Sequence, residues 1–227
     1  MSYKTLIVIH TIIGFAALIT FWIAAIARKG SALHRTAGKL YILSMLVILA
    51  SVVPMIVVKL QAGSTAFAVV LLYLFCITAG AILVAWSAIR KKKIKSEYQS
   101  LLFKFSASVV LVFGLGILSL ALAEQSLLYF IFSTVGIFLG GSMWWNVLKK
   151  SHDKRWFLAE HLNGVTVLFA ATHGSFLRFG LTGIFPIPDS PELNTFTQMS
   201  MISLAYLLRA WLGRRFLASG KLIYGEV

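Results

Sequence analysis

The residues best suited to chemistry are four histidines that lie inside or beside long apolar segments, namely His10, His34, His161 and His173. Ionisable side chains are costly in hydrocarbon, so those found there are the first candidates for function. At 1.5 Å of rise per residue, His10 lies roughly 9 Å below the start of its segment, and His173 lies about 18 Å beyond His161. This spacing predicts two pairs, His10 with His173 near the outer membrane face and His34 with His161 near the inner face.

Neutral imidazoles from facing helices are suitable ligands for haem iron, and this arrangement is typical of membrane b-type cytochromes. We therefore interpret the two pairs as candidate haem b sites that pass electrons across or within the membrane. Arg178 on the outer side and Arg35 on the inner side are the expected partners of the haem propionates. Glycines beside three of the histidines would leave room for a macrocycle, and these are Gly14, Gly164 and Gly174. Twelve residues on a helix give about 120° of rotation, so His161 and His173 would face different neighbours.

A second interpretation is a zinc site at the cytoplasmic surface. Nitrogen and carboxylate ligands suit zinc, and an acidic residue beside an open coordination position serves as a base in metal-assisted hydrolysis. No HExxH spacing supports this interpretation. Its ligand set would be His34, His161, Glu160, His152 and Asp153, with Glu160 as the base.

A third interpretation is that the histidines are structural and bind no cofactor. Polar side chains in membranes often hydrogen-bond between helices and fix their register. Arg209 must then be paired, exposed to an aqueous cavity or extended to the membrane surface. Its candidate partners are Glu160, Asn146 and Asn163. Under this interpretation the protein is a transporter or a membrane-embedded accessory subunit.

The elements that must position these residues are seven apolar runs. The chain has 227 residues, of which 59% are hydrophobic and 12% charged, against about 25% charged in ordinary soluble domains. Each run is long enough to cross a hydrocarbon layer about 30 Å thick, and none shows the alternation of a barrel strand. The sequence predicts an all-α bundle of seven transmembrane helices that forms one domain over residues 1–227. The predicted spans are residues 4–27, 38–58, 64–89, 101–123, 127–148, 156–177 and 196–216.

The basic residues follow the odd-numbered runs. Seventeen of the 21 lysines and arginines fall within residues 28–39, 90–104, 149–155 and 214–221. Because cytoplasmic loops are enriched in such residues, this pattern predicts an outside N-terminus, a cytoplasmic C-terminus and a bacterial plasma-membrane location. The net charge of +14 is therefore interpreted as topological. The expected partners are the bilayer, its anionic lipid headgroups, and a redox partner or a second copy of the chain, but not nucleic acid.

Small residues in the predicted spans indicate close helix packing. Gly114 and Gly116 lie in the fourth run, and Gly136 and Gly140 form a GxxxG pattern in the fifth. The single cysteine, Cys76, excludes an intrachain disulfide. Residues 185–191 are rich in proline and are expected to form an external loop.

Three motifs resemble those of a bacterial family of predicted multi-pass membrane proteins of unknown function. The first is His10 with Gly14, and the second is an HR-x-x-G-x-x-Y turn at His34, Arg35, Gly38 and Tyr41. The third is His161, which opens a helix rich in small residues. The chain departs from the family pattern at Thr172-His173-Gly174, where the family has threonine and alanine, which weakens His173 as a shared ligand. The resemblance implies a multi-pass helical fold and favours His10, His34 and His161, but it implies no activity.

Overall fold

The computed structural model describes residues 3–149, 154–180 and 190–218 of the chain, and within these ranges it contains helices but no strand. The prediction of an all-α protein is confirmed. The helices are α1 Tyr3–Ile26, α2 Ala32–Gln61, α3 Thr65–Arg90, α4 Lys95–Tyr98, α5 Leu101–Glu124, α6 Leu127–Leu148, α7 Trp156–Ser175 and α9 Pro191–Gly213. Two π-helical turns, η1 Phe176–Gly180 and η2 Arg214–Ala218, extend α7 and α9.

Five helices are long and apolar enough to cross a membrane: α1 from Thr5, α2, α3, α5 and α6. The chain thus has the character of a membrane protein. Helices α7 and α9 are not among these five, although they cover most of the sixth and seventh predicted spans. Polar residues lower the apolar character of α7, which contains Glu160, His161, Asn163 and His173.

Two helices begin earlier than predicted because serine residues cap them. The hydroxyl of Ser31 accepts a hydrogen bond from the backbone N–H of His34, and α2 starts at Ala32 instead of residue 38. The hydroxyl of Ser190 accepts one from the N–H of Leu193, and α9 starts at Pro191 instead of residue 196. Proline at the first helical position loses no intrahelical bond, since that N–H has no partner in any helix. The last residue of the predicted proline-rich loop therefore begins α9.

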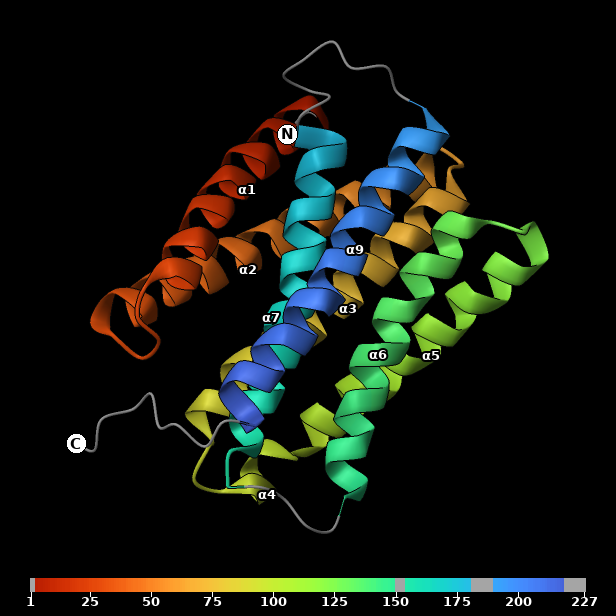
Figure 1. The fold of residues 1–227 in the computed structure, drawn as a ribbon. Helices are drawn as coiled ribbons and strands as arrows, with labels where there is room; N and C mark the ends of the chain where they lie inside the picture. The colour runs from red at the N-terminus through yellow and green to blue at the C-terminus, as the bar shows by residue number, and fades with distance from the viewer. Residues whose placement is uncertain (1–2, 150–153, 181–189, 219–227) are drawn as a thin grey trace. The chain divides into compact units, whose positions relative to one another are not determined.

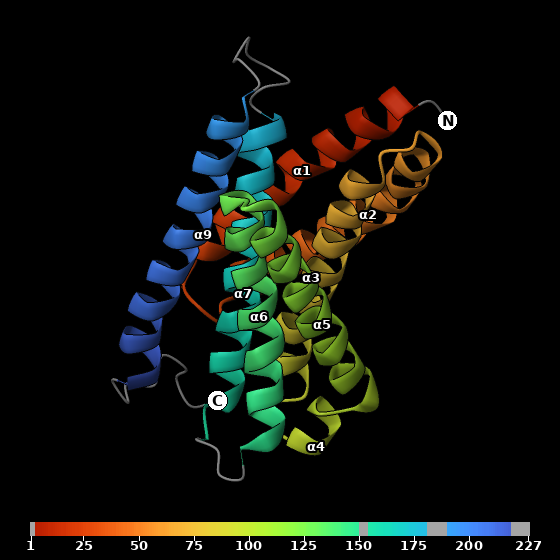
Figure 2. The same cartoon turned by 90° about the vertical axis from the view of Figure 1, so that its right-hand side faces the viewer.

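Two compact units make up the chain, the first reaching Phe75 and the second starting at Cys76. In the first unit α1 packs against α2, and the rings of Phe21 and Tyr41 meet edge to face with centroids 5.3 Å apart. In the second unit α5 lies beside α6 and α7 lies beside α9 (Figures 1 and 2).

Helices α5 and α6 pack so closely that their backbones are in direct contact. A Cβ added at Gly140 would lie 2.7 Å from the Leu111 nitrogen, and one at Gly114 would lie 2.8 Å from the Ile137 nitrogen. In contrast, a Cβ at Gly116 or Gly141 would meet nothing within 4 Å. The expected close packing is therefore made by Gly114, Gly136 and Gly140, since a Cβ at Gly114 would also lie 2.9 Å from the Gly136 carbonyl carbon, while Gly116 faces open space.

The second unit buries polar groups and exposes apolar ones. Helix α7 buries Glu160, Asn163, Thr166, Thr172 and His173, whereas Leu102, Phe105 and Val112 on α5 are all at least 62% exposed. A soluble protein would show the opposite distribution, because large exposed apolar patches are unfavourable in water. This arrangement fits a bundle surrounded by lipid.

Candidate functional site

All four candidate histidines are anchored through the same ring nitrogen. His10 Nδ1 lies 2.8 Å from Ser51 Oγ, and His34 Nδ1 lies 2.9 Å from the Ala24 carbonyl oxygen. His161 Nδ1 lies 2.8 Å from the Ala85 oxygen, and His173 Nδ1 lies 2.9 Å from the Phe169 oxygen. The His173 ring also stacks on Phe169 with centroids 4.1 Å apart.

These contacts determine the tautomer of each neutral ring. A carbonyl oxygen only accepts hydrogen bonds, so Nδ1 of His34, His161 and His173 must carry the hydrogen. Ser51 donates its own hydroxyl hydrogen to the Ile48 oxygen at 2.7 Å, and therefore accepts from His10. In every case the lone pair of the neutral ring is then on Nε2. Imidazoles that ligate metals or haem iron through Nε2 are usually oriented by an Nδ1–H hydrogen bond of this kind.

Each predicted haem pair has one member in each unit. His10 and His34 belong to the first unit, and His161 and His173 belong to the second. The individual rings are therefore described above, whereas the pairing of His10 with His173 and of His34 with His161 stays a prediction.

The prediction that glycines beside the histidines leave room for a macrocycle is wrong for two of the three glycines. A Cβ at Gly164 would lie 2.7 Å from the Ala81 oxygen and from the Ala85 nitrogen, so the backbone of α3 fills this space. At Gly174 the Gln198 side chain fills the space. Of these three glycines, Gly14 alone has nothing within 4 Å of an added Cβ. Glycine is needed at positions 164 and 174 because neighbouring helices pack against them, and the space there does not accommodate a macrocycle.

The arginines expected beside propionates have different surroundings. Arg35 is exposed in the first turn of α2, where Nη1 donates to the Gly30 oxygen at 2.7 Å. Arg178 is buried in η1, five residues beyond His173. Neither arrangement tests the predicted role in haem binding.

The zinc ligand set is only partly described. His152 and Asp153 lie outside the described residues. Within the described ranges no three His, Cys, Asp or Glu side chains come together in a way that could hold a metal ion. Glu160 instead has a different set of partners.

Glu160 lies at the centre of a buried polar cluster, here called the Glu160 cluster, made by Tyr98, Asn146 and Glu160. The carboxyl is 6% exposed and accepts a hydrogen bond from the Tyr98 hydroxyl to Oε2 at 2.9 Å. The Asn146 side chain is hydrogen-bonded to the same carboxyl. The cluster joins α4, α6 and α7 and stabilises a carboxyl group that would be costly to bury alone.

Helix α4 covers this cluster. Tyr98 is 1% exposed, and its ring packs on Phe103 and Trp156 with centroids 4.5 and 4.8 Å away. Lys95 Nζ and Gln99 Nε2 donate to the Asn146 carbonyl oxygen at 3.0 and 2.7 Å. Burial, and then the neighbouring Glu160 charge, raise the pKa of Tyr98, so the phenol stays protonated and donates.

Arg209 on α9 has one of its three candidate partners. Its Nε donates to Asn163 Oδ1 at 2.6 Å, which links α9 to α7. Asn146 instead belongs to the Glu160 cluster. The proposed pairing of Arg209 with Glu160 is limited to an electrostatic interaction at longer range.

The sequence interpretation missed Lys95, Tyr98 and Gln99. They were included in a basic loop whose only expected role was topological. A single tyrosine that follows four lysines, shortly before an apolar span, is the signal that could have identified an anchored segment. Burial of an aromatic side chain in an apolar interior is favourable, so a tyrosine close to an apolar span is expected to pack against it.

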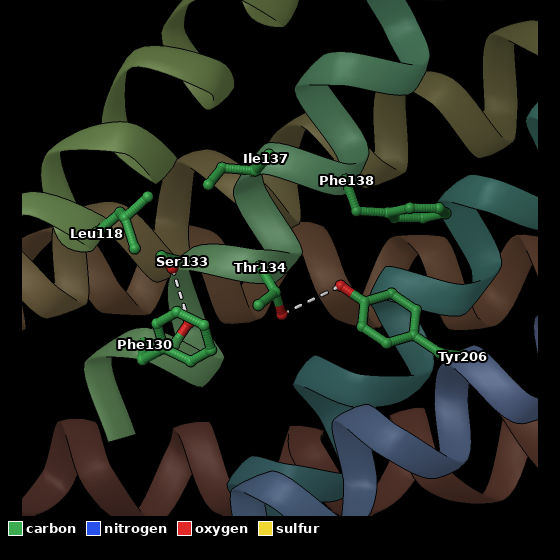
Figure 3. A pocket seen from close by; sticks show the side chains of 7 residues that line it. All are labelled: Leu118, Phe130, Ser133, Thr134, Ile137, Phe138 and Tyr206. Carbon is green, nitrogen blue, oxygen red and sulfur yellow. Dashed lines mark hydrogen bonds between the residues drawn. The ribbon is translucent and has the colours of Figure 1, made fainter. Parts of the chain in front are cut away.

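A separate open pocket lies between α5, α6 and α9, with a volume of about 490 Å³ (Figure 3). Its lining is almost entirely apolar and comprises Leu118, Phe130, Ser133, Thr134, Ile137, Phe138 and Tyr206. The Tyr206 hydroxyl donates to Thr134 Oγ1 at 3.3 Å, and Thr134 donates to the Ile131 oxygen. Both hydroxyls therefore donate their hydrogen to another atom of the protein, and no histidine lies among the lining residues.

Comparison with known proteins gives no match to a family model, to a curated protein or to a solved structure.

Proposed function

We propose that this chain is a multi-pass membrane protein that binds haem b through histidines and passes electrons across or within the membrane. The observation that carries this proposal is the shared orientation of the four imidazoles, each with Nδ1 donating to an oxygen and its lone pair on Nε2. Four imidazoles in the same tautomer, with the lone pair on Nε2, form a donor set that suits haem iron. The chain has a single further histidine.

In this proposal His10 and His173 hold an outer haem, and His34 and His161 hold an inner one. The bound group would supply a one-electron exchange at iron. The chain supplies fixed ring orientations, because each Nδ1–H bond limits rotation of the imidazole about its own axis. Arg178 and Arg35 would face the propionates at the two ends.

We also propose that seven helices span a bacterial plasma membrane with the N-terminus outside. The five long apolar helices and the position of the basic residues support this topology. Single cysteines introduced into a Cys76→Ala background, one at residue 126 and one at residue 93, test it by labelling of intact cells with an impermeant maleimide. We expect residue 126 to be labelled from outside and residue 93 only after lysis, and the reverse result would overturn the orientation.

The experiment that tests haem binding is an absorption spectrum of the purified protein, oxidised and then reduced with dithionite, together with a metal analysis. We expect a Soret band and sharp bands on reduction. His161→Ala and His10→Ala should each lose a haem, whereas His152→Ala serves as the matched control and should keep both. A colourless protein from haem-replete cells would overturn the proposal.

The alternative is a transporter or an accessory subunit with structural histidines. The bond from His161 to the Ala85 oxygen joins α7 to α3, and the Arg209–Asn163 bond joins α9 to α7, which favours a role in helix registration. This alternative predicts no haem and no stoichiometric metal. Stoichiometric zinc that is lost in His152→Ala would instead support the cytoplasmic metal site.

A further inference from the structure

Arg209 presents a hydrogen-bonding edge that no described residue uses. A guanidinium carries five N–H groups in a planar fork. The Nε–H of Arg209 donates to Asn163 Oδ1, and within residues 3–149, 154–180 and 190–218 Arg209 makes no other hydrogen bond and no ion pair. The four N–H groups on its two terminal nitrogens are therefore available to a ligand. Because the bond to Asn163 fixes one edge of the plane, the opposite edge is held in a defined orientation.

The guanidinium lies at the C-terminal end of α9. A Cβ added at Gly213 would lie 2.6 Å from Arg209 Nη1, so the side chain runs along the helix toward its last turn. Extension of a long basic side chain toward the membrane surface is the usual way to keep its charge out of hydrocarbon. Arg209 is partly exposed, so a ligand can reach it from the surrounding medium. Gly213 provides the space that this conformation needs.

The charges around this position are mostly positive. Arg214 and Arg215 follow in η2, and Arg155, at the start of α7, donates to the Phe216 and Leu217 carbonyl oxygens at 3.3 and 2.7 Å. Among the described residues, Glu160 is the acidic group that interacts electrostatically with Arg209. That carboxyl is buried and already receives hydrogen bonds from Tyr98 and Asn146, so it does not occupy the free edge of the guanidinium.

We propose that Arg209 is the phosphate-binding residue of an anionic lipid site between the start of α7 and the end of α9. A phosphate offers oxygens in the spacing that a guanidinium fork binds with two parallel hydrogen bonds. Basic pockets between transmembrane helices bind anionic headgroups on the cytoplasmic side. This inference rests on the proposal that α7 and α9 cross the membrane, but it does not depend on haem.

Thermal unfolding of the purified full-length protein, titrated with phosphatidylglycerol or phosphatidylcholine, tests this site. We expect phosphatidylglycerol alone to raise the Tm. Arg209→Gln should weaken its apparent affinity by about tenfold or more, as expected for loss of hydrogen bonds to a charged group. Arg209→Lys keeps the charge but loses the fork and should give an intermediate affinity. Lys93→Gln removes an exposed positive charge that lies between α3 and α4, outside the proposed site, and is the control, with a change of about twofold or less.

Gly213→Ala provides a second variant that keeps the arginine. Alanine is a better helix former than glycine, so the fold is retained, while the new methyl group displaces Nη1 and should weaken lipid binding. A titration with inorganic phosphate distinguishes the source of the phosphate: protection by the free ion at lipid-like concentrations, lost in Arg209→Gln, would support a phosphate site but overturn its assignment to lipid. An unchanged response to phosphatidylglycerol in both Arg209→Gln and Gly213→Ala would overturn the site altogether.

Discussion

Two adjacent glycines on α6 give a sharp test of the packing between α5 and α6. Gly140 and Gly141 have the same helical backbone and differ in what a methyl group would meet. At Gly140 the new Cβ would lie 2.7, 2.8 and 2.9 Å from the nitrogen, Cβ and Cα of Leu111. At Gly141 it would meet nothing within 4 Å. The contacts at Gly140 include backbone atoms, so the two helices must separate to accept the methyl group.

The expected magnitude follows from this difference. Overpacking of a close contact costs about 1–3 kcal/mol, and both alanine variants gain up to about 1 kcal/mol in helix propensity. The difference between the two variants therefore isolates the contact and should be about 1–3 kcal/mol. For a protein of this size, 1 kcal/mol corresponds to roughly 2–4 °C in Tm. We expect Gly140→Ala to unfold about 2–12 °C below Gly141→Ala in the same detergent.

The assay is thermal unfolding of the two variants and the wild type, followed by intrinsic fluorescence. Gly114→Ala and Gly116→Ala repeat the comparison on α5, where only Gly114 faces the neighbouring backbone. Equal Tm values for Gly140→Ala and Gly141→Ala would refute the reasoning, because the backbone contact would then contribute nothing to stability.

Other predictions concern the polar network and the helix caps. Tyr98→Phe removes a hydrogen bond to the buried Glu160 carboxyl and should lower the free energy of unfolding by about 1–3 kcal/mol, whereas Tyr129→Phe should not; equal effects in chemical unfolding would contradict the role of Tyr98. Because the pKa of Tyr98 is raised above its ordinary value near 10, the stability linked to its protonation is present below about pH 10 and lost at higher pH. The Tm difference between wild type and Tyr98→Phe should therefore shrink above about pH 10, and a difference independent of pH would contradict the burial of the phenol. Ser190→Ala should cost about 1 kcal/mol through loss of the α9 cap, and serine-to-alanine substitution at the exposed Ser119 is its control in the same unfolding assay.

Much of the helical framework could be predicted from apolar run length. The predicted second and seventh helices begin too late, because Arg35 and Pro191 are assigned to loops, whereas both residues lie in the first turns of α2 and α9. Charged side chains are compatible with the first turns of a helix that begins outside the hydrocarbon. A serine that caps the backbone N–H three residues later is a short sequence signal, and a long pattern of basic residues obscures it.

The candidate site was less predictable for a different reason. Histidine positions are visible in the sequence, but three of the four ring partners are backbone carbonyl oxygens, which every residue carries. The Glu160 cluster joins residues from three helices separated by up to 62 positions, and no local pattern records such a contact. The contacts of Glu160 with Tyr98 and Asn146 therefore become evident only from the arrangement of the helices.

The polar interior of α7 has a consequence for biosynthesis. A segment that contains Glu160, His161, Asn163 and His173 partitions poorly into lipid on its own, because polar and ionisable side chains disfavour translocon-mediated insertion of a helix. Helices α3 and α6, which supply the Ala85 carbonyl and the Asn146 side chain, are synthesised before α7. We therefore expect α7 to enter the membrane efficiently only when the preceding helices are already in place, and a nascent chain lacking them to release this segment into the aqueous phase.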